Sequence, residues 1–272
     1  MWATYLGLTT RVVSEFNRDM TKPANTLVRV TFEDGVATME LARPDARNAI
    51  SLSMIADMEK ALQEIESAAD TRVMVLRGEG KSFCAGMDLK AVQSEPLAMV
   101  EMLGRLAKVN TRIRRLSIPT IAQVQGAAIG GGCGLMVVCD FAVTHPEAKV
   151  GYPEVDLGIC PAVIAPWLIK RIGPGKARAM LLAGGTMSGQ EGFEAGLATH
   201  MVSLDELESQ VQKLTKRLLK GGPNALAATK AWLNELDGSL DDELLEKGGD
   251  ISARLIQEDE AQSRLRAAFG GN

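Results

Sequence analysis

The sequence predicts an α/β core followed by a helical appendage. Up to about residue 200, helical segments are interspersed with short apolar blocks that either alternate with polar residues or run unbroken, as strands do. From Leu204 onward only helical spacing recurs. The chain has 272 residues, 46% hydrophobic and 24% charged, which suits a soluble globular protein with a sizeable core. We therefore divide it into a loose N-terminal extension (1–25), the core (26–200) and a helical region (201–272).

The first predicted elements are a hairpin, a helix and a buried strand. Apolar residues alternate at 28–32 and at 37–41, and Asp34-Gly35 between them suits a tight turn with positive φ angles. Ser51 is a suitable N-cap for the helix that follows. Its expected buried face consists of Ile55, Met58, Leu62 and Ile65. The run 73–76 predicts a buried strand.

The remaining elements follow from the same periodicities. In the core we expect a helix at 96–116, strands at 121–124 and 141–143, an apolar helix between these strands that ends near Asp140, and short helices at 162–172 and 175–183. In the helical region we expect helices at 207–218, 224–236 and 241–267.

Two glycine-rich segments invite comparison with phosphate-binding loops. Gly80-Lys81-Ser82 lacks the earlier glycine of a P-loop, because Val75 stands there, and the run 130–134 fits no register of the dinucleotide pattern G-x-G-x-x-G. Glycines at the start of a helix nevertheless expose backbone N–H groups, which favour an anion or a developing oxyanion. The alternative is that they only let the helix pack closely on a strand.

Five segments together resemble the crotonase (enoyl-CoA hydratase/isomerase) family. In chain order they are Arg43-Pro44-Asp45-Ala46-Arg47-Asn48-Ala49, Ser82-Phe83-Cys84-Ala85-Gly86-Met87-Asp88-Leu89, Ile118-Pro119-Thr120-Ile121-Ala122, Gln125 to Leu135 with Cys139-Asp140, and Gly151 to Gly158. Each alone is a weak signal, but they keep the order and spacing of the family from about residue 26 to 200.

The resemblance implies a fold, a substrate class and a set of site residues. The fold would be a spiral of ββα units assembled as trimers or hexamers, and the substrate an acyl-CoA thioester, with no cofactor besides the coenzyme A of the substrate. Carried over by position, the backbone N–H groups of Met87 and Gly131 would form an oxyanion hole. The residues near CoA would be Ala46, Arg47, Ala85 and Lys90.

One catalytic carboxylate of the resembled hydratases is missing. Gly134 stands where the first of two glutamates falls, whereas Glu154 matches the second. Partial burial after Pro153 would raise the pKa of Glu154 toward a useful value. If 154–156 were extended, Asp156 would face the same way and is a candidate second acid, although a solvated or ion-paired role is the alternative.

The loop 158–167 resembles the version found in bacterial methylglutaconyl-CoA and isohexenylglutaconyl-CoA hydratases. We therefore expect hydration of an enoyl-CoA, with a branched, carboxylated substrate as the finer prediction. Such a carboxylate needs a donor, and the candidates are Arg105, Lys108 and Arg112. Isomerisation or decarboxylation through the same enolate stays open, as does a non-catalytic CoA-binding subunit.

Composition limits the other partners. A net charge of −4 and a pI near 5.4 give no basic footprint for nucleic acid or an anionic membrane. Four cysteines and two histidines show no metal-binding spacing, so we expect free thiols and no metal. The first residues show no secretory signal, which makes a cytoplasmic location the expectation. The apolar faces of the helical region predict a homotrimer or homohexamer.

Overall fold

Strands of the chain form two sheets in the computed structural model, which describes residues 26–92 and 95–269. Among these residues a six-stranded sheet has the order β1-β2-β3-β4-β6-β9, and a three-stranded sheet has the order β5-β7-β8. The strands of the larger sheet are β1 (Val28–Glu33), β2 (Val36–Leu41), β3 (Val73–Gly78), β4 (Thr120–Gln123), β6 (Phe141–Thr144) and β9 (His200–Met201). Those of the smaller sheet are β5 (Ala128–Ile129), β7 (Lys149–Gly151) and β8 (Thr186–Ser188). The predicted extension 1–25 lies outside the described residues.

The larger sheet advances in chain order. The hairpin β1–β2 is antiparallel, with positive φ at Asp34 and Gly35 as the turn requires. From β2 onward each neighbouring pair is parallel, so every connection must cross over the sheet. Strand order that follows chain order through repeated crossovers is the spiral arrangement that the family resemblance implied.

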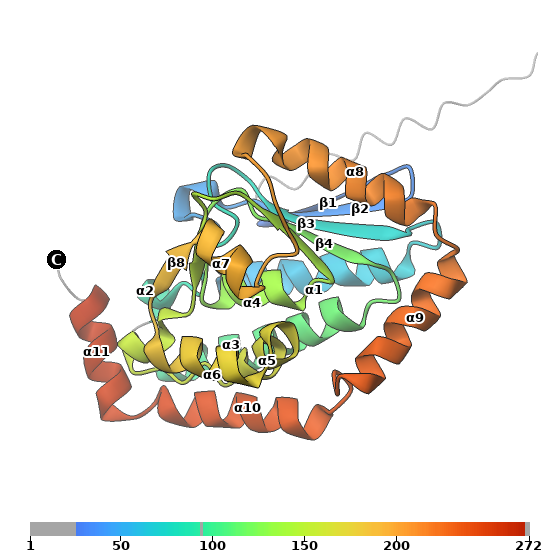
Figure 1. Cartoon of the computed structure of the whole chain (residues 1–272). Coiled ribbons are helices and arrows are strands. Elements are labelled where there is room, and N and C mark those ends of the chain that lie inside the picture. Colours follow the sequence, from blue (N-terminus) through green and yellow to red (C-terminus); the bar gives the residue numbers. More distant parts are fainter. Residues whose placement is uncertain (1–25, 93–94, 270–272) are drawn as a thin grey trace, which may run out of the picture.

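Helices cover both faces of this sheet (Figure 1). Successive side chains along each strand point to opposite faces, so both faces carry side chains that a helix can bury. Val73 and Val75 of β3 point to a small cluster completed by Leu207 and Val211 of α8 (Leu207–Leu219). Met74 and Leu76 point instead into the main core. The helical region is therefore partly core structure, since α8 closes one face of the sheet.

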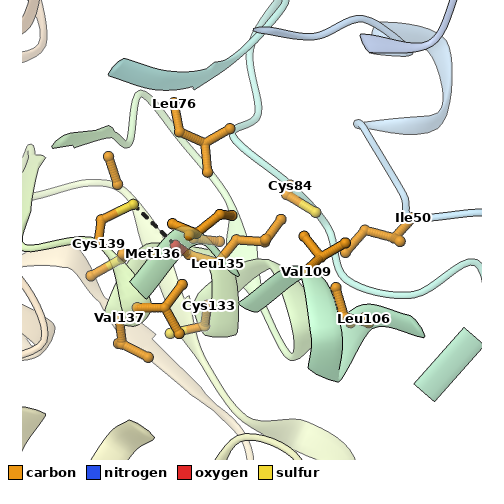
Figure 2. Close-up of a cluster of buried hydrophobic side chains, with 14 of the residues drawn as sticks. Ile50, Leu76, Cys84, Leu106, Val109, Cys133, Leu135, Met136, Val137 and Cys139 are labelled. Carbon is orange, nitrogen blue, oxygen red and sulfur yellow. Dashed lines mark hydrogen bonds between the residues drawn. The ribbon is translucent and has the colours of Figure 1, made fainter. Parts of the chain in front are cut away.

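The main core is built around α1 (Leu52–Ser67), α3 (Pro96–Arg115) and α4 (Gly131–Val138). Ser51 caps α1 by accepting a hydrogen bond from the backbone N–H of Met54 at 3.2 Å, and the predicted face of this helix is buried. All residues of α4 are buried, and its C-terminal half packs among Leu76, Cys84 and Val109 (Figure 2). The free Cys84, Cys133 and Cys139 are buried there, and burial raises the pKa of each thiol to about 12.

The remaining helices are η1 (Pro44–Ala46), α2 (Leu89–Val92), η2 (Pro153–Leu157), α5 (Ala165–Ile172), α6 (Pro174–Ala183), α7 (Gly189–Ala195), η3 (Leu204–Glu206), α9 (Pro223–Leu236), α10 (Asp242–Leu255) and α11 (Asp259–Phe269). Three of them, α5, α6 and α9, match predicted ranges, two divide one predicted range, and the short ones were not predicted. The single periodic stretch predicted at 241–267 is thus two helices, which break between Leu255 and Asp259. This break lets α10 contact α3 and α5 while α11 contacts η2 (Figure 1).

Candidate active site

A cavity of about 430 Å³ lies where α3, the N-terminus of α4, η2 and the C-terminal helices meet. Of the eight residues expected to be catalytic or to lie near CoA, seven line it: Ala46, Arg47, Ala85, Met87, Lys90, Gly131 and Glu154. They come from segments separated by more than a hundred positions, and the fold brings them to one place. The eighth, Asp156, does not line the cavity.

The loop that carries Met87 and the loop that leads to Gly131 are hydrogen-bonded to each other beside this cavity. The N–H of Cys84 donates to the carbonyl of Ala127 at 2.8 Å, and the N–H of Ile129 donates to the carbonyl of Cys84 at 3.0 Å. These bonds fix Met87 and Gly131 relative to each other. In the described part of the chain, neither the Met87 N–H nor the Gly131 N–H has a protein acceptor. Gly131 is the first residue of α4, where the N–H has no partner within the helix.

Glycine allows the two loops to approach this closely. A Cβ at Gly132 would lie 2.2 Å from the carbonyl oxygen of Cys84, which no side chain tolerates. Gly86 has a φ of +95°, and a Cβ there would lie 2.8 Å from the carbonyl oxygen of Ile129. The glycines therefore have a packing role, because they let the loops that carry Met87 and Gly131 lie against each other.

Glu154 is held beside the start of α4 by the smaller sheet. Gly130 donates to the carbonyl of Gly151 at 2.8 Å, and η2 begins two residues after Gly151. The Glu154 Oε1 would lie 3.0 Å from a Cβ on Gly130. Its Oε2 is buried and has no partner among the described residues. Burial raises the pKa of this carboxyl from its ordinary 4.5 to about 7, against the opposing effect of a hydrogen bond from its own backbone N–H.

The expectation that 154–156 is extended is wrong. The segment forms the 3₁₀ helix η2, in which residues two apart project to different sides because three residues make one turn. Asp156 is exposed, and its Oδ2 accepts a hydrogen bond from the backbone N–H of Gly185 at 3.1 Å. The carboxylates of Glu154 and Asp156 therefore do not face one cavity.

The cationic lining residues Arg47 and Lys90 are exposed at its mouth. The loop that carries Arg47 is organised by the buried Asn48, whose Nδ2 donates to the carbonyls of Glu79, Ser82 and Phe83. The carbonyl of Arg47 accepts from the N–H of Ala85 at 3.0 Å, which ties the predicted CoA residues together. Two exposed cations at an entrance suit an anionic ligand such as a phosphate.

The candidate cations for a substrate carboxylate lie elsewhere. Arg105 pairs with Glu59 at 2.7 Å, Arg112 pairs with Glu66 at 2.7 Å, and Lys108 is exposed. None of the three lines the cavity. The prediction that they face the acyl group is wrong, because they lie on faces of α3 that meet α1 or solvent.

Sequence reasoning missed most of the apolar lining. Leu103 and Leu106 come from α3, Ile159, Val163 and Ile164 from the loop after η2, Ile256 from the end of α10 and Phe269 from α11; the polar Ser252 of α10 also lines the cavity. Helical periodicity predicted apolar faces in α3 and in the C-terminal helices but gave no sign of what those faces meet. The sequence also suggested that Gly134 leaves room for a branch of the substrate, but the Cδ1 of Ile164 takes that place, 2.4 Å from where a Cβ at 134 would lie.

A site with two free N–H groups beside a buried carboxyl of raised pKa suits an enzyme that stabilises a developing oxyanion and moves a proton. Comparison with known proteins defines this class further. The family described as enoyl-CoA hydratase/isomerase matches residues 31–267. The chain belongs to this family, and its activity is of the enoyl-CoA hydratase/isomerase type, with an acyl-CoA substrate.

Individual relatives agree in sequence and in structure. A crotonyl-CoA hydratase of Syntrophomonas wolfei is 34% identical over 75% of this chain and 79% of that protein. The structure of Pseudomonas aeruginosa AtuE is 31% identical, covers 86% of this chain and 93% of that chain, and has a TM-score of 0.74. An enoyl-CoA hydratase from Bacillus halodurans covers 89% of this chain and 99% of that chain with a TM-score of 0.81; at 24% identity it shows the fold alone.

Within residues 26–92 and 95–269, the helices are all too short or too polar to cross a membrane. The same residues contain no cluster of three or more acidic, histidine or cysteine side chains arranged to hold a metal ion.

Proposed function

We propose that this protein is a hydro-lyase that adds water across the double bond of an α,β-unsaturated acyl-CoA. The single observation that carries the proposal is that Glu154, whose Oε2 is buried and whose pKa is near 7, shares one cavity with Met87 and Gly131, whose N–H groups are free. The thioester oxygen would accept hydrogen bonds from both N–H groups. The CoA phosphates would lie toward Arg47 and Lys90 at the mouth, with Ala46 and Ala85 beside the cofactor portion of the substrate.

In the proposed reaction one carboxylate, that of Glu154, both accepts and returns the proton. The Glu154 carboxylate accepts a proton from water as the water oxygen bonds to the β-carbon, and the double-bond electrons move onto the thioester oxygen as an enolate. The protonated Glu154 then returns that proton to the α-carbon, so the net change is the addition of one water molecule. Two N–H donors aimed at the enolate oxygen stabilise the transition state, and one such donor is typically worth roughly 10²–10³ in rate.

The test is an assay of the purified protein with crotonyl-CoA and longer enoyl-CoA esters, with products identified by mass. Gain of one water supports the proposal. Migration of the double bond without a change of mass, or release of CO₂, would instead support isomerisation or decarboxylation through the same enolate. Tight binding of the esters without any turnover would identify a non-catalytic subunit.

The acyl group is the finer part of the proposal. The carboxylated, glutaconyl-type substrate expected from the loop 158–167 needs a positive partner for its carboxylate. Among the described lining residues only Arg47 and Lys90 are cationic, and both are exposed at the mouth. The apolar lining supports an uncharged acyl chain. A kcat/KM for 3-methylglutaconyl-CoA ~10²-fold above that of crotonyl-CoA would favour the carboxylated substrate instead, because this factor corresponds to about 2.7 kcal/mol, within the reach of one charged hydrogen bond.

We also propose a homotrimer or homohexamer, supported by apolar side chains left exposed on the C-terminal helices. Trp232, Leu233 and Leu236 of α9 are each more than half exposed, at 56%, 53% and 63%. Exposed apolar side chains gathered on one helix mark an interaction surface. Light scattering at micromolar concentration should give a mass three or six times 29.1 kDa. A monomer would contradict this assignment and leave α9 without a partner.

A further inference from the structure

A buried asparagine without a hydrogen-bond partner lies close to the inner wall of the cavity. Asn110 of α3 is fully buried, and neither its Oδ1 nor its Nδ2 has a partner among the described residues. A side-chain amide offers two donors and an acceptor, and buried polar side chains are nearly always paired. This amide is therefore suited to a partner that the protein itself does not supply.

The helix places Asn110 on the same side as the cavity. Leu103 and Leu106 line the cavity, and Asn110 follows them by seven and four positions, so the three side chains share one face of α3. The Nδ2 of Asn110 would lie 3.7 Å from a Cβ on Gly134. The Cδ1 of Ile164, a residue of the cavity wall, would lie 2.4 Å from that same point. The Asn110 amide and the Ile164 side chain of the cavity wall therefore both lie next to Gly134.

The atom nearest to the position of a Cβ on Gly134 is the terminal methyl group of Ile164, Cδ1. The Cδ1 of Ile164 changes place by rotation about χ2 alone, between staggered positions and without movement of the backbone. Gly134, having no side chain, does not occupy the space around this methyl group. An acyl chain that displaces the methyl group would extend the cavity toward the amide of Asn110.

We propose that Asn110 is a specificity-determining residue that hydrogen-bonds an uncharged polar group, a hydroxyl or a carbonyl, on the acyl chain beyond its reacting carbons. The inference rests on the proposed function, because it takes the acyl chain to occupy this cavity. A neutral amide among apolar side chains compensates a neutral polar group, whereas an ion there would lose its hydration without a counter-charge. Arg47 and Lys90, the cationic side chains among the described lining residues, are exposed at the mouth and so supply no counter-charge to an ion beside Asn110.

The experiment measures binding of saturated CoA esters, which cannot be hydrated. Dissociation constants of hexanoyl-CoA, ω-hydroxyhexanoyl-CoA and adipoyl-CoA are compared by calorimetry for the wild type, Asn110→Leu and Thr215→Val. Thr215 of α8 is a matched control, because its buried hydroxyl is also unpartnered among the described residues and it does not line the cavity. Asn110→Ala repeats the test with a smaller side chain if the leucine variant does not fold.

The wild type should bind the hydroxylated ester about tenfold more tightly than hexanoyl-CoA, which is about 1.4 kcal/mol. Asn110→Leu should abolish this preference without weakening hexanoyl-CoA, while Thr215→Val should keep it. Equal affinities in the wild type, or equal losses for both esters in Asn110→Leu, would overturn the inference. Tightest binding of adipoyl-CoA would overturn the uncharged class of ligand.

Failure of the proposed hydration reaction can be distinguished from failure of the role proposed for Asn110. If no enoyl-CoA is hydrated but the preference and its loss in Asn110→Leu are observed, the reaction is wrong and the specificity assignment stands. If none of the esters binds, both are overturned.

Discussion

The first and second turns of α4 use glycine for opposite purposes. At the first turn Gly130 has a φ of +54°, and Gly131, whose N–H has no acceptor among the described residues, lines the cavity with Glu154. One turn later, the position of a side chain at Gly134 is already filled by Ile164. The first turn is built around backbone polarity, and the second is built around the packing of an apolar wall.

This difference changes the meaning of the missing glutamate. A carboxylate at 134 would require Ile164 to move, so the glycine and the isoleucine are a complementary pair rather than a loss at one position. The polar chemistry of the site is then concentrated in Glu154 and two N–H groups. Each of the following predictions separates the roles of the two turns.

The largest effect is expected from removing the N–H at the first turn. Proline is tolerated at the first position of a helix, where its φ fits and the N–H makes no helical bond, so Gly131→Pro deletes the donor with little cost to the fold. We expect kcat to fall roughly 10²–10³-fold relative to Gly131→Ala. The alanine variant is the control for crowding, because a Cβ there would lie 3.0 Å from the Cδ2 of Leu106. Equal rates in the two variants would remove the N–H from the mechanism.

The carboxyl beside that turn should come next. Glu154→Gln keeps the shape of the side chain but cannot move a proton, so we expect a loss of ~10²-fold or more in kcat with little change in the affinity for a saturated acyl-CoA. Asp156→Asn is the matched control two residues away, and its rate should stay within about twofold of wild type. A large loss in the control with a normal rate in Glu154→Gln would exchange the roles of the two acids.

Stability should depend on pH through Glu154. Its pKa is raised from 4.5 in the unfolded chain to about 7 in the folded protein, so between these values the folded state holds a proton that the unfolded state has released. The contribution of this group is therefore fully present below pH 4.5 and is lost as pH rises toward 7. In Glu154→Gln the fall in unfolding free energy over this interval should be smaller, by an amount of up to roughly 3 kcal/mol. Denaturant titrations at several pH values test this, and identical slopes for both proteins would contradict the raised pKa.

How much the sequence could predict differs between the two turns. The first turn and the site residues Met87, Arg47 and Glu154 were predicted because each lies in a short sequence motif. A short motif can be recognised from neighbouring residues alone, without knowledge of long-range contacts. The hairpin and the buried face of α1 were predicted for the same local reason. The 3₁₀ conformation of 153–157 was missed, because a proline followed by alternating acidic and apolar residues is compatible with an extended segment as well.

The second turn could not be predicted, because its meaning is a long-range contact. Gly134 and Ile164 are thirty positions apart, and neither residue signals the other. The same holds for Asn110, whose burial without a partner depends on three elements packing together, and for Ser252 and Ile256, which reach the cavity because α10 packs against α3 and α5. Periodicity shows that a face is apolar but does not show which surface it will meet.

The smallest expected effect measures that contact directly. Gly134→Ala places a Cβ against the Cδ1 of Ile164, and such overpacking costs about 1–3 kcal/mol of unfolding free energy. Ile164→Val removes that methyl group and alone should cost about 0.5–1.5 kcal/mol. In the double variant the clash is gone, because the nearest remaining atom of residue 164 would lie 3.5 Å from the new Cβ, an ordinary contact. The loss of unfolding free energy in the double variant should therefore be smaller than the sum of the two single losses, by at least about 0.5 kcal/mol. Leu135→Val combined with Gly134→Ala is the control, since Leu135 packs in the core beside α4 and does not line the cavity. Strict additivity in the Gly134–Ile164 cycle would mean that the wall yields to a side chain at 134, and the difference between the two turns would then be one of chemistry alone.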